Sequence, residues 1–158
     1  MIILGIDPGT TRIGYGLIEK DAGIHLLRCG LISGEGVAPE EQLVLLEKEL
    51  VSLINKTTPD LMCVEKLFFS KNKKTAFAVA EARGVIIMSA RKLGIKVLEF
   101  APNEIKSIVA GDGRADKKGV ERAVCMTLGT DSIPGPDDVS DALAVALCGA
   151  FSRNTEGA

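Results

Sequence analysis

The chain has 158 residues, of which 46% are hydrophobic and 25% charged, as expected for one soluble globular domain rather than a fibre or a disordered segment. At this size a chain buries roughly 68–70% of the surface that it exposes when unfolded, so its core needs neither disulfides nor a structural metal. No apolar run approaches the roughly 18 residues of a membrane span, and the N-terminus lacks the features of a secretory signal. We expect a cytoplasmic protein with a single domain over residues 1–151 and a frayed tail over residues 152–158.

The formal net charge of -2 conceals a strong segregation of charge along the chain. Residues 1–65 carry -5, residues 66–122 carry +7 and residues 123–158 carry -4. Acidic ends that supply one site, with a basic middle around it, suit a polyanion held against a metal-binding centre. Solvated helix faces would give the same counts, so charge alone leaves both interpretations open.

The cysteines and the single histidine do not form a recognisable metal or nucleophile motif. Cys29, Cys63, Cys125 and Cys148 are widely spaced, and His25 is the one histidine of the sequence. This pattern disfavours a zinc site and a cysteine nucleophile, and it predicts four buried thiols.

The chain opens with three predicted strands and a helix. Residues 1–7 form an apolar run that stops at a Pro-Gly turn, and extended stretches follow at residues 13–18 and 24–32, which a turn at residues 21–23 separates. Residues 39–55 are predicted to form a helix, because a proline and two acids open it and leucines mark one face.

Strands and helices alternate in the second half of the chain. Residues 60–65 form a fourth predicted strand that ends in a charge, residues 74–92 a long helix and residues 95–100 a fifth strand. Three shorter helices are then predicted near residues 103–110, 116–128 and 136–151. This order predicts an α/β fold, with a mixed five-stranded sheet and helices on both faces.

The predicted helix at residues 74–92 has almost no polar face. A helix that is apolar on nearly all sides must be covered more than once. It lies either at the centre of the domain or between the sheet and a second copy of the chain, and we favour the homodimer.

Four carboxylates occupy unusual places in this scheme. Asp7 and Glu65 each end an apolar strand, where open α/β sheets place their sites. Asp138 and Asp141 are three positions apart on one helix face, and Asp141 leads into the apolar part of the helix, where an unpaired carboxylate is costly. Taken singly, each acid has an ordinary explanation as a turn former, a strand-end group or a helix N-terminal acid.

Taken together, the four acids would repel one another unless cations lay between them. An all-oxygen ligand set without histidine or cysteine favours Mg²⁺, with Mn²⁺ as a substitute. Two such ions can activate a water molecule and stabilise the leaving oxygen of a phosphodiester.

Four stretches stand out in order along residues 1–151: IDPGTTRIGYGLIE, VEKLFFSKN with the downstream EARGV, PNEIKSIVAGDGRADKK, and DDVSDALAVAL. Together they resemble the RuvC family of Holliday-junction resolvases. The resemblance implies an RNase H-like fold, a homodimer, and Mg²⁺-dependent symmetric nicking of four-way DNA junctions in recombination and repair. It also implies cooperation with a branch-migration motor and its junction-binding partner protein.

The resemblance also assigns roles to individual residues. It makes Asp7, Glu65, Asp138 and Asp141 the catalytic, metal-binding acids, and it makes Phe68 the aromatic residue that stacks on an unpaired base, while Phe69 is assigned to the core. A buried Phe68 ring is the alternative. The predicted DNA-binding basic residues are Lys71, Lys73, Lys74, Lys106, Arg114, Lys117 and Lys118. The loop at residues 111–113 could approach phosphate through its backbone, or could simply end a helix.

Two other classes of protein compete with this interpretation. The stretch GIDPGTT also resembles the phosphate loop of actin-like ATPases and sugar kinases, but these need two domains closing over ATP, which 158 residues cannot build. An RNase H-like relative that processes RNA, or an inactive DNA-binding module, is the second alternative. Retention of all four acids and the matching lysines favour the junction nuclease.

Overall fold

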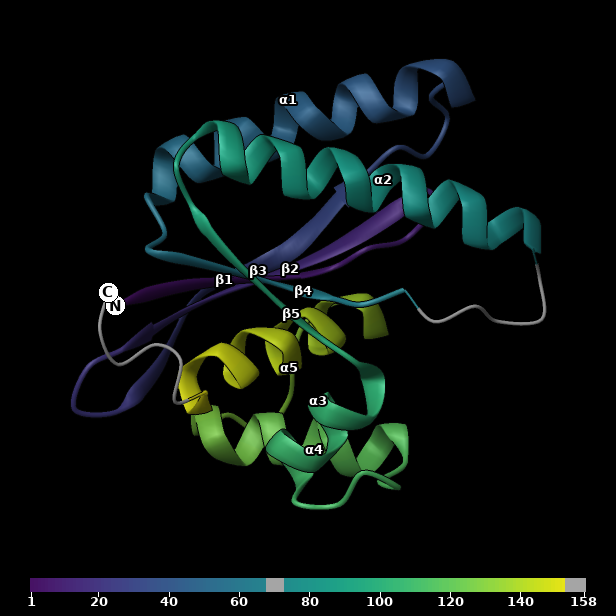
Figure 1. Ribbon diagram of the computed structural model, residues 1–158. Coiled ribbons are helices and arrows are strands. Elements are labelled where there is room, and N and C mark those ends of the chain that lie inside the picture. Colours follow the sequence, from purple (N-terminus) through teal and green to yellow (C-terminus); the bar gives the residue numbers. More distant parts are fainter. Residues whose placement is uncertain (68–72, 153–158) are drawn as a thin grey trace.

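The computed structural model describes residues 1–67 and 73–152 (Figure 1). In these residues the elements follow in the order β1 (Ile2–Asp7), β2 (Arg12–Lys20), β3 (Ile24–Ser33), α1 (Pro39–Thr57), β4 (Leu61–Glu65), α2 (Lys73–Lys92), β5 (Lys96–Phe100), α3 (Pro102–Ala110), α4 (Lys117–Leu128) and α5 (Asp137–Phe151). Every predicted strand and helix is confirmed, with its ends within two residues of those expected. Phe68, Phe69 and Lys71 lie outside the described residues, as does the predicted tail apart from Ser152.

The five strands form one mixed sheet in the order β3-β2-β1-β4-β5. β1 pairs antiparallel with β2, and β2 with β3, whereas β4 is parallel to both β1 and β5. Because β1 and β4 are parallel neighbours with Ile6 opposite Val64, the next residues along them, Asp7 and Glu65, reach the same edge of the sheet.

Helices cover both faces of this sheet, as predicted. α1 and α2 lie on one face, and α5, with α3 and α4 behind it, lies on the other (Figure 1). Alternate residues of β1 serve the two cores: Leu4 and Ile6 pack in the core that α1 and α2 cover, whereas Ile3 packs in the core of α5. Since strand side chains alternate between faces, Asp7 projects on the same side as Ile3, toward α5. Glu65 does so as well, because it is two residues beyond Cys63, which also packs in the α5 core.

The helix at the centre of the molecule is α5, whose residues from Val139 to Ala150 are all buried except Asp141, which is partly exposed. It lies unusually close to the sheet because the strand positions beneath it are glycines. A Cβ atom on Gly5 would lie 2.1 Å from the carbonyl oxygen of Ala142, and one on Gly14 would lie 1.9 Å from that of Asp138. Gly14 pairs with Asp7 across β1 and β2, so this contact brings the start of α5 beside Asp7.

The prediction that α2 could lie at the centre of the domain is wrong. Ala82, Ile86 and Ala90 are buried in the core shared with α1, but Phe77 and Met88 are 69% and 47% exposed. The error has a physical reason: alanines and a glycine make up much of the apolar surface of α2, and such small residues gain little from burial. The alternative position, between the sheet and a second copy, stays a prediction.

The prediction of four buried thiols is half right. Cys63 and Cys148 are buried between the sheet and α5, and burial raises the pKa of Cys148 to about 12, so that it stays protonated. Cys29 and Cys125 are only partly buried, since they lie on the edge strand β3 and on the outer helix α4.

Within the described part of the chain, no helix is long and apolar enough to cross a membrane.

Candidate active site

Asp7 and Glu65 form a hydrogen-bonded pair of carboxyl groups at the ends of β1 and β4. Burial, reinforced by the negative charges of Glu65, Asp141 and Asp138, raises the pKa of Asp7 to about 8. Burial also raises the pKa of Glu65, with a further contribution from Asp141. Near neutral pH the pair therefore holds a proton when no cation is bound.

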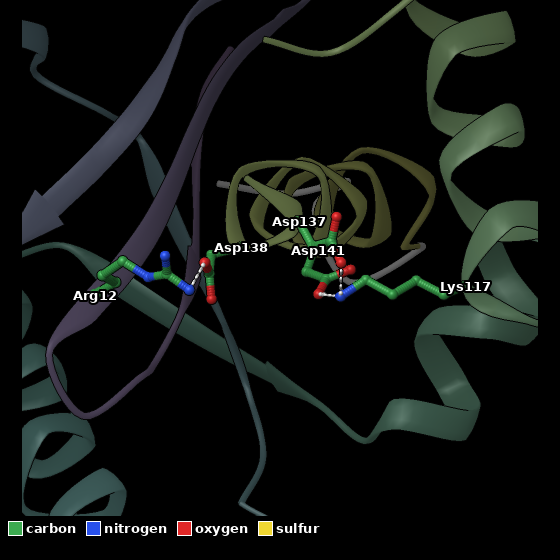
Figure 2. A network of polar contacts seen from close by, with 5 residues as sticks. All are labelled: Arg12, Lys117, Asp137, Asp138 and Asp141. Carbon is green, nitrogen blue, oxygen red and sulfur yellow. Dashed lines mark hydrogen bonds and ion pairs between the residues drawn. The ribbon is translucent and has the colours of Figure 1, made fainter. Parts of the chain in front are cut away.

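Asp138 and Asp141 approach this pair from the first turns of α5, and each already contacts a cationic side chain (Figure 2). Asp138 Oδ2 lies 3.5 Å from Arg12 Nη2. Asp141 Oδ2 lies 2.9 Å from Lys117 Nζ, which is also 3.1 Å from Asp137 Oδ2. The protein's own cations thus offset part of the negative charge of the acids.

Lys117 can contact Asp137 and Asp141 because it is the first residue of α4. Asp116 caps that helix by accepting a hydrogen bond from the Gly119 N–H at 2.7 Å, so Lys117 becomes its first residue. A cavity of about 250 Å³ opens beside Lys117, with Glu65, Asp141 and Lys106 also in its wall. Its remaining lining residues are Pro102, Ile105, Val120 and Ala144. The lining of the cavity therefore combines four apolar residues with two acids and two lysines.

The donor set of this cluster fits a hard divalent cation. Its ligands are carboxylate oxygens, and the charges of three other acids act on Asp7. A carboxyl group whose pKa is raised by its acidic neighbours is stabilised in its charged form when a cation binds there. Among residues 1–67 and 73–152 no three acidic, histidine or cysteine side chains are already arranged as ligands, so side-chain rotations must accompany binding.

The structure brings together six of the predicted site residues: Asp7, Glu65, Asp138, Asp141, Lys106 and Lys117. Arg114 and Lys118 are exposed nearby, at the turn before α4 and in its first turn. Lys73 and Lys74 begin α2, and their side chains, like Phe68 and Lys71, lie outside what the structure describes.

Sequence reasoning missed Arg12 and the second partner of Lys117, Asp137. Arg12 is the first residue of β2, and Asp7 is the last of the antiparallel strand β1, so both lie at one edge of the sheet. The pairing of β1 with β2 was the signal that could have identified Arg12 from the sequence. Asp137 lies in the first turn of α5, where acids are common, and its contact with Lys117 depends on how α4 packs against α5.

Acids from the ends of two central strands and from the first turns of a helix that covers them, on a mixed sheet of this order, define an RNase H-like nuclease. The family model described as "Crossover junction endodeoxyribonuclease RuvC" matches residues 3–149. The chain belongs to this family and is a crossover junction endodeoxyribonuclease. This membership decides against the ATP-dependent phosphotransferases.

Individual relatives agree over nearly their whole length. The chain is 48% identical over 150 residues to the RuvC of Moorella thermoacetica, which covers 94% of this chain and 90% of the relative. It is 45% identical over 158 residues to that of Pelotomaculum thermopropionicum, covering 99% and 96%. Among solved structures, T. thermophilus RuvC in complex with a Holliday junction substrate superimposes with a TM-score of 0.88 at 29% identity, covering 96% of this chain and 93% of that one.

Proposed function

We propose that this chain resolves four-way DNA junctions in recombination and repair by two symmetric nicks, as a cytoplasmic homodimer with one active site for each of two opposed strands. Each copy would contribute a single nuclease domain over residues 1–151. The observation that carries the proposal is the cluster of Asp7, Glu65, Asp138 and Asp141 beside the cavity that Lys106 and Lys117 line.

In this proposal the four acids hold two Mg²⁺ ions, which Mn²⁺ can replace. When bound, the ions supply an activated water and stabilise the leaving oxygen. Asp7 releases its proton as the site fills, because its pKa of about 8 reflects burial and the negative charges of neighbouring acids. Lys106 and Lys117 then face the phosphate next to the site of attack.

The basic residues outside the cavity would contact the junction backbone. Lys71, Lys73, Lys74, Arg114 and Lys118 are the proposed phosphate contacts. Each phosphate neutralised adds about -0.9 to the log-log slope of affinity against salt on duplex DNA, so binding should depend steeply on salt. Phe68, three residues beyond Glu65, is proposed to stack on an unpaired base at the crossover, with Phe69 in the core.

The homodimer is supported by one side of α2. Phe77, Ala80, Gly84 and Met88 are spaced by three or four residues, so they share a helix face, and all four are exposed. A Cβ atom on Gly84 would meet nothing within 4 Å, which leaves space for another helix to approach closely. A two-fold dimer through this face would match the symmetry of a four-way junction. The family implies a branch-migration motor and its junction-binding protein as further partners.

The proposal is tested by incubating the purified chain with a mobile four-way junction and with linear duplex, with and without Mg²⁺. We expect paired incision of the junction only, and only with the cation. Asp7→Asn and Asp141→Asn should bind the junction and not cut it, whereas Asp131→Asn, which changes an exposed acid beyond α4, should cut normally. Cleavage by either active-site variant at the normal rate, or equal cutting of linear duplex, would contradict the proposal.

Phe68→Ala provides a separate test of the stacking role. It should slow cleavage more than it weakens junction binding, because an opened crossover would lose the ring that supports it. An unchanged cleavage rate would place the Phe68 ring in the core instead.

A further inference from the structure

Arg83 of α2 lies between the main chain of Glu65 and the edge strand β5. Its Nε donates a hydrogen bond to the Glu65 carbonyl oxygen at 3.3 Å, and its Nη2 forms an ion pair with Glu99 Oε2 on β5. The Arg83 side chain is only 23% exposed. The Arg83 guanidinium therefore connects α2 and β5 to Glu65, the last residue of β4 and one of the acids of the active site.

The Glu65 carbonyl lacks a backbone hydrogen-bond donor on the neighbouring strand β1. Lys66 N–H donates to the Phe100 carbonyl at 2.8 Å, so Lys66 turns its backbone groups toward β5 and Glu65 turns its own toward β1. Because Ile6 lies opposite Val64, a regular parallel ladder between β1 and β4 would next pair the Glu65 carbonyl with the N–H of residue 8. Residue 8 is Pro8, which has no N–H.

The rest of β1 follows the same alternation. The Met1 nitrogen and carbonyl both pair with Lys20, at 2.9 and 2.8 Å, so odd-numbered residues of this chain segment face β2 and even-numbered ones face β4. Position 8 therefore faces β4, and it is the point at which the backbone hydrogen bonds between β1 and β4 stop. Arg83 supplies the donor that the proline lacks.

Arg83 approaches from the side of the sheet opposite the acids. Pro8, Glu65, Val79 and Arg83 line a small pocket of about 100 Å³ beside α2, whereas the cavity that Glu65 shares with Asp141 is lined by residues of α3, α4 and α5. The guanidinium therefore contacts the backbone of Glu65 without entering the catalytic cavity. Its charge is offset by Glu99, so it need not compete with a cation at the acids.

We propose that Arg83 is a positioning residue: by bonding the Glu65 carbonyl in place of the missing Pro8 donor, it fixes the last peptide of β4 and so the direction of the Glu65 carboxylate. The inference rests on the proposed role of Glu65 as a catalytic, metal-binding acid. Groups that orient a metal ligand typically change metal affinity or activity about 10-fold to 100-fold when they are removed.

The test compares Arg83→Gln with Arg91→Gln, which changes an exposed arginine two turns further along α2. Mn²⁺ affinity, junction affinity without divalent ions, single-turnover cleavage and Tm are measured, each well below the Tm of every variant. We expect Arg83→Gln to weaken Mn²⁺ binding and slow cleavage, each about 10-fold to 100-fold, with junction affinity within about twofold. Arg83→Lys should recover part of the Mn²⁺ affinity and part of the cleavage rate. Arg91→Gln should match the unmodified chain.

Normal Mn²⁺ affinity in Arg83→Gln, or a loss that appears only in Tm or in junction binding, would overturn the positioning role. The donor itself is tested by Pro8→Ala, which restores an N–H at position 8. In the Arg83→Gln background Pro8→Ala should recover part of the lost Mn²⁺ affinity, whereas strictly additive effects would overturn the donor argument. Glu65→Gln separates the two levels of inference: if it cuts normally, the role of Glu65 fails and the Arg83 proposal fails with it, whereas an inactive Glu65→Gln beside an Arg83→Gln of normal Mn²⁺ affinity would overturn the role of Arg83 alone.

Discussion

The carboxyl groups of Asp7 and Glu65 are hydrogen-bonded to each other at the ends of two parallel strands. Two carboxyl groups can make such a bond only if one of them keeps its proton. Burial and three neighbouring acids raise the pKa of Asp7 to about 8, so the proton is present at neutral pH in the metal-free protein. Metal affinity and stability are therefore both linked to this proton.

Metal binding should release the Asp7 proton. Between about pH 6 and pH 8 we expect Mn²⁺ affinity to rise roughly tenfold per pH unit and to level off above the Asp7 pKa. Calorimetry in buffers of different ionisation enthalpy counts the protons released, and the count should approach one at pH 7. A count near zero at that pH would contradict the proposed state of the pair.

Asp7→Asn should stabilise the metal-free protein while abolishing cleavage. The folded protein keeps the Asp7 proton from pH 3.8 to about 8, whereas the unfolded chain loses it near 3.8. The folded state thus binds more protons in this window, so its stability falls as pH rises through it. We expect Asp7→Asn to remove this fall and to add on the order of 2 kcal/mol at pH 8.

Thermal unfolding with a chelator present, at pH 5 and pH 8, measures this effect. The gain should be larger at pH 8 and should shrink when Mg²⁺ is added, because the cation stabilises the charged form of the unmodified chain. Asp131→Asn serves as the control at both pH values. A lower Tm for Asp7→Asn at pH 8 without metal would refute the burial argument.

The local periodicity of the sequence was enough to predict the sheet edge at which Asp7 and Glu65 meet. Strand alternation and helix spacing depend on neighbouring residues, so both can be inferred from the sequence alone. Arg12 and Arg83 were not predicted, because their contacts depend on the packing of β2 and α2 against the ends of other strands. Pro8, visible in the sequence as a turn former, gave no indication that an arginine 75 positions later would replace its missing N–H.

Composition also failed to distinguish the two apolar helices. Both α2 and α5 are rich in alanine, but glycines in β1 and β2 lie beneath α5 alone. Their missing side chains let that helix approach the sheet and become the buried one. The pairing of helix with strand, rather than the helix sequence, therefore decides which helix is central.

Lys117→Gln should separate metal binding from catalysis. Lys117 Nζ contacts both Asp137 and Asp141, so its removal eliminates a cation that competes for Asp141. We expect Mn²⁺ to bind severalfold more tightly to the DNA-free protein, while cleavage slows because a phosphate contact is lost. Lys118→Gln, at the next position of α4, should leave Mn²⁺ affinity unchanged. Weaker Mn²⁺ binding in Lys117→Gln would mean that Lys117 supports the site rather than competing for it.

Gly84→Arg should convert the proposed homodimer into a folded monomer. The position is exposed, with nothing near a Cβ atom, so one copy can accommodate the side chain but a closely packed second α2 cannot. Analytical ultracentrifugation measures the change, and junction cleavage should lose its pairing of nicks. Met126→Arg is the control, since Met126 is 83% exposed on α4, across the sheet from α2 (Figure 1). A Gly84→Arg dimer of normal affinity would place the interface elsewhere.

Gly14→Ala should damage the active site through the backbone alone. The added Cβ would lie 1.9 Å from the Asp138 carbonyl oxygen, so the start of α5 must move away from β2 and carry Asp138 and Asp141 away from Asp7. We expect a loss of about 1–3 kcal/mol in stability. Cleavage should fall at least about 100-fold even where the protein is fully folded, because small displacements of catalytic groups are costly.

The matched control is Leu17→Ala on the same strand. Leu17 is buried on the opposite face, under α1 and α2, so its truncation should cost about 2–5 kcal/mol without moving α5. Cleavage and Mn²⁺ affinity, measured below the Tm of both variants, should therefore stay normal in Leu17→Ala and fail in Gly14→Ala. If the two variants lost activity in proportion to their stability, the close approach of α5 to Gly14 would matter for folding and not for the placement of the acids.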